Sequence, residues 1–348
     1  MPFYQCPQCK KRWQYPLAKC PDCLLGVEKI VGRKAQVIGV SKVNIPTLLH
    51  PKVPYFVLVL EDEKGNRWVQ KSEKEYQIGQ QHLSGFIPNK SAVAIERINY
   101  DISEAIGKVV GLIGGIKVNH NSKVLILPTV VAPRHPHLAE NTSPQFLDYT
   151  IKYLLAKQLP PKNIAVVGQS FNDFPIESSM KKSKLLSVCQ RNKVAALDLS
   201  KQEFMKKERG PLSFFVSKKV LDSDLIINLP ILKLDAQLKI KGAVYNTLKL
   251  LEKGSFASLG SEELLKKFPK DLSSMLTIAE ASVIQRKNKQ TAFLGLVLAS
   301  FNPFNLDRVF GEIAMETDLP EYLKNTKIEN ITVTGRRIGE VQHDISQN

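Results

Sequence analysis

Cysteine is scarce in this sequence beyond residue 23, where Cys189 is the only one. A single thiol in so long a stretch excludes a disulfide framework there and is too few for an iron–sulfur cluster. Long apolar runs are also missing: the longest, Ala292–Ala299, is far shorter than the roughly 20 residues of a membrane-spanning helix. No secretory signal pattern precedes the first cysteines. We therefore expect a cytoplasmic protein with no membrane association.

The other four cysteines lie close together, as Cys6-Pro-Gln-Cys9 and Cys20-Pro-Asp-Cys23. Two such pairs provide the four tetrahedral thiolates of a structural Zn²⁺ site, with Zn–S distances of about 2.3 Å. A pair of disulfides is the alternative, and the expected reducing compartment disfavours it. Four sulfur ligands leave no open coordination position. The predicted metal site therefore organises structure and performs no chemistry.

The composition is that of an ordinary globular protein, with 348 residues, 43% hydrophobic and 24% charged. This length suffices for two or three domains with separate cores. The net charge of +16 favours anionic partners. Because the positive charge is spread along the chain, a small anionic molecule is favoured over nucleic acid.

Residues 1–30 are expected to form a zinc ribbon and residues 31–85 a small β-barrel. Strands are predicted at Lys34–Val43, Pro54–Glu61 and Arg67–Lys71. The last two flank a turn at Lys64-Gly65-Asn66, which is typical of a hairpin. Short strands with glycine-containing turns favour a Greek-key barrel of the OB type. Its aromatic residues are Tyr55, Phe56 and Trp68. They form either a surface on which bases stack or part of the barrel core.

From about residue 92 to 340, apolar strands alternate with helical patterns, which predicts an α/β domain with a mostly parallel sheet. Strands are expected at Ala92–Ile98, Lys123–Val131, Ile164–Gly168, Val194–Leu197, Leu225–Leu229, Thr291–Ala299 and Ile331–Thr334. Helices are expected at Ile102–Ile113, from Pro144 after a cap at Ser143, and at Gly242–Glu252, Ser261–Phe268 and Leu306–Met315.

Ligands of open α/β sheets bind at the carboxyl ends of the strands. Segments that follow three of the predicted strands should meet there. The candidate ligand-binding residues on and near these segments are Arg134, His137, Asn141, Thr142, Asp173, Lys233, Lys241 and Asn246. Their cations would hold a phosphate or carboxylate, and the N-terminus of the helix at Gly242 would add N–H groups.

Three residues of this region are candidates for chemistry. Lys233 follows an apolar strand, so burial would lower its pKa and make it a base or nucleophile; a fixed charge on a ligand oxygen is the simpler role. His135 is a candidate general acid–base, and Asp235 lies near Lys233 in sequence. His135 and His137 would bind a metal only with a third ligand such as Asp173 or Asp235.

Several features of the first 85 residues resemble the rubredoxin-like zinc ribbon and OB-fold found beside acyl-CoA enzymes. They are the two cysteine pairs, the strand Gly32–Val43, the segment Pro51–Glu61 and the Gly79 turn before His82. The resemblance implies an adaptor that binds an acyl-CoA-like ligand or docks onto a thiolase-like enzyme.

The remaining chain resembles the family called domain of unknown function 362. The resemblance rests on segments that include Val124–Thr129, Asn141–Pro144, Asp224–Lys233, Gly242–Asn246 and Asn302–Asp307. Members usually have Lys-Pro-Asn where this chain has Leu127-Pro128-Thr129. Asp235 stands in place of a histidine, and Tyr245-Asn246 in place of Lys-Asn. We therefore expect either chemistry on other residues or binding without catalysis.

Together these observations favour a zinc-binding adaptor fused to an α/β domain that binds an anionic small molecule. Whether the α/β domain is an enzyme stays open. The alternatives are a nucleic-acid-associated zinc-ribbon/OB protein and a non-catalytic scaffold for a thiolase-like partner.

Overall fold

The chain divides into two units, Met1–Ile87 and Pro88–Asn348. The computed structural model describes residues 3–15, 17–30, 35–46, 53–72, 75–82, 89–169, 174–209, 212–255, 261–272 and 274–345. Each unit is described by itself. In the described residues, no helix combines the length and the apolar character needed to cross a bilayer.

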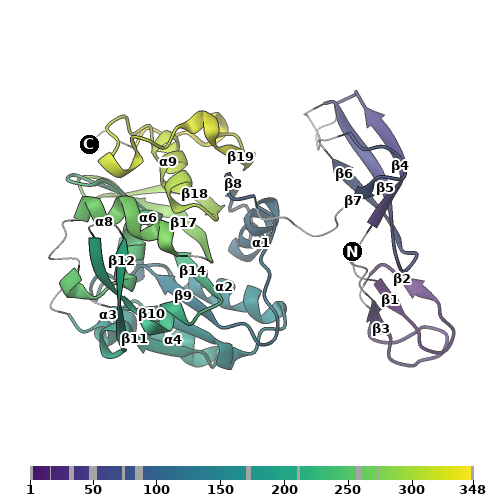
Figure 1. Cartoon of the computed structure of the whole chain (residues 1–348), viewed down its shortest axis with the longest axis horizontal. Coiled ribbons are helices and arrows are strands. Elements are labelled where there is room, and N and C mark those ends of the chain that lie inside the picture. The colour runs from purple at the N-terminus through teal and green to yellow at the C-terminus, as the bar shows by residue number, and fades with distance from the viewer. Residues whose placement is uncertain are drawn as a thin grey trace. The chain divides into compact units, whose positions relative to one another are not determined.

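The first unit begins with a three-stranded antiparallel sheet in the order β2-β1-β3 (Figure 1). Its strands are β1 (Phe3–Gln5), β2 (Arg12–Trp13) and β3 (Glu28–Ile30). The two cysteine pairs lie in the turns that follow β1 and precede β3. The chain therefore has a small N-terminal cysteine-rich region with short antiparallel strands.

The rest of this unit is a four-stranded antiparallel sheet in the order β6-β5-β4-β7. Its strands are β4 (Ala35–Val43), β5 (Tyr55–Asp62), β6 (Arg67–Ser72) and β7 (Gln81–His82). Within the described residues these strands follow an open path, so the closed OB barrel stays a prediction. Tyr55, Phe56 and Trp68 are all at most 9% exposed, which makes them core residues and not a surface for stacking bases.

The turn between β5 and β6 shows how local sequence sets the register of this sheet. The Asp62 carboxylate accepts hydrogen bonds from the backbone N–H groups of Lys64 and Asn66, at 2.8 and 2.9 Å. Gly65 has φ +72°, a conformation that side chains disfavour. The predicted hairpin at these residues is confirmed.

The second unit is built on a ten-stranded sheet with the path β11-β10-β9-β14-β17-β18-β8-β19 (Figure 1). Beside this path, β15 pairs with β17 and β16 pairs with β15. The strands are β8 (Ala92–Arg97), β9 (Val124–Pro128), β10 (Ile164–Gly168), β11 (Ala195–Asp198), β14 (Leu225–Leu229), β15 (Ile231–Asp235), β16 (Lys239–Lys241), β17 (Met275–Gln285), β18 (Thr291–Ser300) and β19 (Thr332–Gly335). The pairings β11-β10-β9-β14-β17 are all parallel, whereas β18 and β16 run antiparallel to their neighbours. The predicted α/β architecture with a mostly parallel sheet is confirmed.

Helices cover both faces of this sheet. One face packs against α1 (Ile102–Leu112), α2 (Pro144–Ala156), α3 (Ile176–Lys182) and α4 (Leu185–Arg191). The other packs against α5 (Lys218–Leu221), α6 (Ala243–Thr247), α8 (Ser261–Lys267), α9 (Pro303–Ile313) and α10 (Ile338–Val341). Because the sheet is covered twice, β9 and β14 are buried at every position, as their unbroken apolar runs predict. Cys189 is a buried core residue of α4.

Helix starts follow their caps. Ser143 accepts a hydrogen bond from the Phe146 N–H at 3.2 Å, and α2 begins at Pro144 as predicted. Asn302 caps α9, which begins at Pro303, three residues before the predicted start. The predicted helix at Gly242–Glu252 is shorter, because after α6 the chain tightens into a 3₁₀ turn at Leu248–Leu250.

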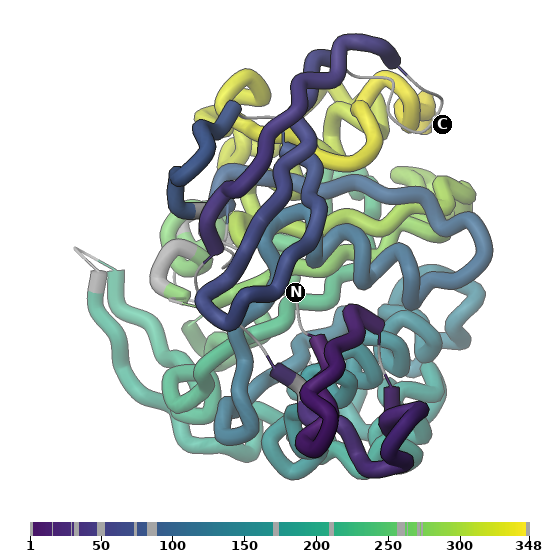
Figure 2. Tube along the Cα trace, turned by 90° about the vertical axis from the view of Figure 1, so that its right-hand side faces the viewer, coloured from purple at the N-terminus to yellow at the C-terminus, as the bar shows by residue number. Residues whose placement is uncertain are grey.

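Several strands escaped prediction. The hairpin β12 (Phe204–Arg209) and β13 (Leu212–Ser217) extends from the body of the unit (Figure 2). Lys206 and Lys207 lie in β12. The segment around Lys233 and Lys241, for which no strand was predicted, is the hairpin β15–β16, in which these two lysines are a register pair.

Candidate functional site

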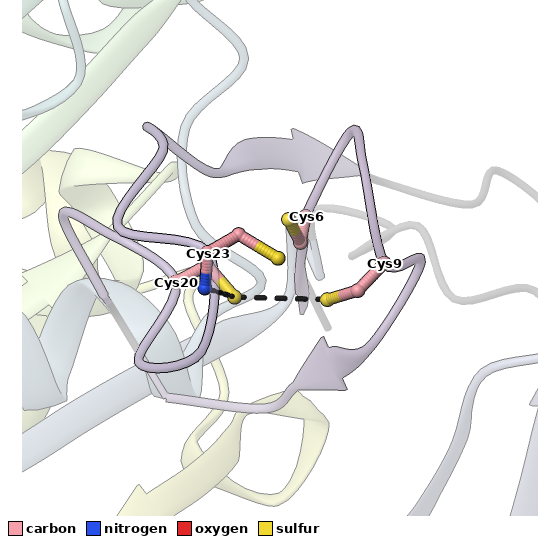
Figure 3. A group of neighbouring side chains, drawn as sticks. All are labelled: Cys6, Cys9, Cys20 and Cys23. Atoms are coloured by element: carbon pink, nitrogen blue, oxygen red, sulfur yellow. Dashed lines mark hydrogen bonds between the residues drawn. The ribbon is translucent and has the colours of Figure 1, made fainter.

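The four N-terminal cysteines form one cluster in which every Sγ lies within 4.8 Å of the others. Figure 3 shows the thiols turned toward one another, Cys6 and Cys9 from one loop and Cys20 and Cys23 from the other. The Sγ atoms of Cys9 and Cys20 are 3.6 Å apart, and all four cysteines are unbridged. Four thiols placed this close together could hold one metal ion.

The two loops that carry these cysteines share one backbone design. Cys6 N–H donates to Lys11 O at 3.0 Å and Cys6 O accepts from Lys10 N–H at 3.1 Å. Cys20 makes the equivalent bonds with Leu25 and Leu24, at 2.8 and 2.9 Å. Lys10 and Leu24, each directly after the second cysteine of its pair, share a left-handed backbone with φ +59° and +56°. Such tight turns aim both thiols of a pair at one point.

The Cys6 and Cys23 thiols differ in acidity. The backbone N–H of Cys9 lowers the pKa of the Cys6 thiol to about 7. Burial raises the pKa of Cys23 to about 12. The Cys6 thiolate therefore forms readily, whereas Cys23 would need a bound metal ion to lose its proton. Among the described residues, this is the only group of three or more His, Cys, Asp or Glu side chains placed to share an ion.

A different kind of site lies at the carboxyl edge of the sheet in the second unit. Here a cavity of about 380 Å³ opens where β9 and β14 end, and the hairpin β15–β16 forms one wall. The polar and charged residues that line it are Thr129, Arg134, Glu140, Lys233, Asp235, Lys241, Tyr245, Asn246, Lys249, Gln285 and Lys289. Residues far apart in the sequence thus converge where the topology places ligands in α/β sheets.

Lys233 lies in the wall of this cavity and is only 8% exposed. Its Nζ donates to Glu140 O at 2.6 Å, which is a backbone carbonyl and not a carboxylate. Burial lowers the pKa of Lys233 to about 8. The amine therefore carries its charge at neutral pH.

Lys249 is a second buried lysine in the same cavity, which the sequence analysis did not identify. It is 6% exposed, lies in the 3₁₀ turn after α6, and donates from Nζ to Val130 O at 2.6 Å. Burial, and then the charge of Lys233, lower the pKa of Lys249 to about 7. Lys249 and Tyr245 line the same cavity.

The other charges around the cavity are mostly paired. Lys241 forms an ion pair with Asp235 at 2.7 Å, and its Nζ lies 5.4 Å from the centre of the Tyr245 ring. Arg134 lies 3.7 Å from the Glu140 carboxylate. Even without Lys249, whose pKa is about 7, the cations Arg134, Lys233, Lys241 and Lys289 outnumber the anions Glu140 and Asp235 in the lining. The lining therefore carries a net positive charge.

The N-terminus of α6 does not serve this cavity as expected. The Asp307 carboxylate, reached from α9, accepts the N–H groups of Ala243 and Val244 at 2.6 and 2.9 Å. These two donors are therefore occupied by an internal carboxylate. Burial raises the pKa of Asp307 to about 7.

Three of the predicted ligand-binding residues have buried side chains whose polar atoms are already partnered. Asn246 donates to Leu127 O and Asn228 Oδ1, at 3.0 and 2.9 Å, and accepts from Thr129. Asn141 and Thr142 bond to backbone groups of the loop after β9 and of β14. These side chains shape the site by fixing the segments around it.

His135 and His137 line a neighbouring cavity of about 630 Å³, together with Tyr100, Lys184, Glu280 and Phe293 among others. Their Nδ1 atoms are 2.6 Å apart, so one ring donates to the other. Reduced solvation and the nearby His137 lower the pKa of His135. Neither Asp235 nor another described residue completes a metal site with them. Asp173 lies outside the described residues.

The model of the family named Domain of unknown function (DUF362) matches residues 124–312, more than half of the chain. This stretch holds the carboxyl edge of the sheet and the whole lysine-lined cavity. The chain therefore belongs to this family. Comparison with curated proteins finds no match.

Two solved structures are similar in part. The Ltp2-ChsH2(DUF35) aldolase is 19% identical over 29% of this chain and 76% of that chain, with a TM-score of 0.20. The lactate racemase apoprotein from Thermoanaerobacterium thermosaccharolyticum is 7% identical over 65% of this chain and 57% of that chain, with a TM-score of 0.38. Similarities this low carry no argument about function.

Proposed function

We propose that the α/β unit binds a small anionic molecule, a carboxylate or phosphate, in the lysine-lined cavity. The observation that carries this proposal is that Lys233 and Lys249 face one cavity, each bonded only to a backbone carbonyl among the described residues. The ammonium of Lys233, which is charged at neutral pH, is costly to bury unless it is paired. An anionic ligand supplies the missing partner and is held by charge-assisted hydrogen bonds.

The size and the remaining charges agree with such a ligand. At about 380 Å³ the cavity lies at the small end of known ligand sites. Arg134 and Lys241, although paired with acidic neighbours, add positive potential at its rim. Asp235 belongs to an ion pair with Lys241, so its supporting role is to orient that lysine.

Calorimetric titration with inorganic phosphate and with small carboxylates tests the proposal. Lys233→Met is expected to weaken binding at least tenfold, because it removes a charged hydrogen bond worth about 1.5–3 kcal/mol. Lys108→Ala, on the exposed face of α1, is the matched control and should bind like wild type. Equal affinity of both variants for every anion that binds would overturn the proposal.

For the first unit, we propose that the four cysteines hold Zn²⁺ and that the unit serves as an adaptor. Their mutual distances support a tetrahedral site, and the positive chain charge suits an acyl-CoA-like ligand or an acidic partner surface. A thiolase-like enzyme is the proposed partner. Co-purification from the native host, with and without Cys20→Ser, tests this adaptor role. Recovery of the same partners by both forms would contradict it.

A further inference from the structure

We infer that Lys249 is an amine nucleophile that forms an imine with a carbonyl compound bearing a carboxylate. This inference rests on the proposed anion site, since it assigns the two buried lysines different tasks. Lys233 holds the carboxylate, and Lys249 attacks the adjacent carbonyl. The substrate class is therefore that of small 2-oxo acids.

The surroundings of Lys249 favour the neutral amine. Among the described residues its Nζ donates to one backbone carbonyl, Val130 O at 2.6 Å, and the neighbouring charge that acts on it is the cation Lys233. A neutral amine keeps this hydrogen bond through one of its two N–H groups and has a lone pair free for attack. With a pKa lowered to about 7, about half of the Lys249 amines are neutral at pH 7.

The surroundings of the two lysines explain the division. The groups that face the cavity with them are Arg134, Glu140, Asp235, Lys241, Tyr245 and Lys289. The charges of Glu140 and Asp235 raise the pKa of Lys233, opposing its burial and the charge of Lys241, which lower it. For Lys249, the neighbouring charge is the cation Lys233, which acts in the same direction as burial. Lys233 thus has nearby carboxylates that favour its charged form, and they do not act on Lys249.

The step balances without a redox partner. The Nζ lone pair forms a bond to the carbonyl carbon. The carbonyl oxygen leaves as water, which takes one hydrogen from the amine and one proton from solvent. The product is a protonated imine that retains one N–H. That N–H can still donate to Val130 O, so the bond seen in the free site also stabilises the developing positive charge.

The alternative is a purely structural role, in which Lys249 only holds its 3₁₀ turn against the segment after β9. Any polar side chain with a hydrogen-bond donor could serve the Val130 carbonyl in this way. A structural role also does not explain why the amine lines a cavity. Reactivity separates the two roles, because a purely structural lysine would react no faster than lysines on the surface.

The test is reductive trapping with glyoxylate and cyanoborohydride, followed by peptide mass mapping of the full chain. We expect a single reduced adduct on Lys249, formed well before adducts on exposed lysines such as Lys108. Its rate should reach half of its maximum near pH 7, whereas exposed lysines become reactive only toward their ordinary pKa near 10.4. Lys249→Arg should abolish the adduct, and Lys233→Met should slow its formation by weakening glyoxylate binding.

Glycolate, which has the carboxylate but no carbonyl, separates this inference from the proposed function. If glycolate binding depends on Lys233 while glyoxylate modifies exposed lysines as fast as Lys249, the imine is excluded and the anion site stands. If glycolate also fails to bind, both fail. Labelling of the wild-type chain decides the matter even where Lys249→Arg folds poorly.

Discussion

A Cβ atom on Gly242 would lie 2.2 Å from Oδ1 of Asp307, so the residue before α6 must be glycine for this carboxylate to cap the helix. The cap joins α9 to α6 and thereby positions the turn that carries Lys249. A side chain at position 242 would need the space that the Asp307 carboxylate already fills.

Gly242→Ala should therefore lower the free energy of unfolding by about 1–3 kcal/mol, because it displaces Asp307 and leaves buried N–H groups without acceptors. Chemical denaturation measures this directly. Gly107→Ala is the control, since a Cβ at that position in α1 meets no atom within 4 Å. Alanine there should stabilise the helix by about 0.5–1 kcal/mol. Equal effects of the two substitutions would contradict the cap.

The low pKa of Lys249 predicts how its removal changes stability with pH. In the unfolded chain its pKa is near 10.5, and in the folded chain it is about 7. Folding therefore carries a penalty that is complete below pH 7 and disappears as the pH rises toward 10. Lys249→Met removes this penalty, so its stability relative to wild type should be greatest at pH 6 and decline steadily up to pH 10. A constant difference would show that the amine titrates normally.

Much of the scaffold of this site could be predicted from the sequence, because it rests on local signals. The buried strand β14 is an unbroken apolar run, and Ser143 with Pro144 sets the start of α2 through a cap that needs no distant partner. Lys233 was identified for a similar reason, since it follows such a run. Its burial in a cavity wall agrees with that expectation.

Features that depend on distant contacts were missed. Lys249 lies between Leu248 and Leu250, and in an amphipathic helix a lysine in such a position is expected on the exposed side. Here the three residues form a 3₁₀ turn in which the Lys249 side chain is buried. The strand β17 contains Glu280, whose burial is possible because Oε2 accepts the Ser143 N–H at 2.8 Å from another part of the chain. A hydrogen bond between residues so far apart in the chain cannot be predicted from the local sequence around either one.

The cysteine cluster predicts a strong dependence of the first unit on metal. Cys20→Ser should release about one ion per chain and unfold the ribbon, because such sites contribute apparent folding energy on the order of 10 kcal/mol. Elemental analysis and far-ultraviolet circular dichroism measure the two effects. Cys189→Ala, in the core of α4, should retain the metal. Iron with a visible rubredoxin-like spectrum would overturn the zinc assignment, and a ribbon that stays folded without metal would overturn its structural role.

Anion affinity should fall as the pH rises through the pKa values of the two buried lysines. Below about pH 7 both are protonated; Lys249 loses its proton near 7 and Lys233 near 8. Affinity for glycolate should thus be highest near pH 6. Above the pKa of each amine that contacts the anion, the affinity should fall by up to about tenfold per pH unit. In Lys249→Met, Lys233 is the one of the two buried lysines that still titrates within this range, so the decline should begin about one unit later. Titration calorimetry from pH 6 to 9 distinguishes these curves. An affinity independent of pH in wild type would mean that neither amine contacts the anion.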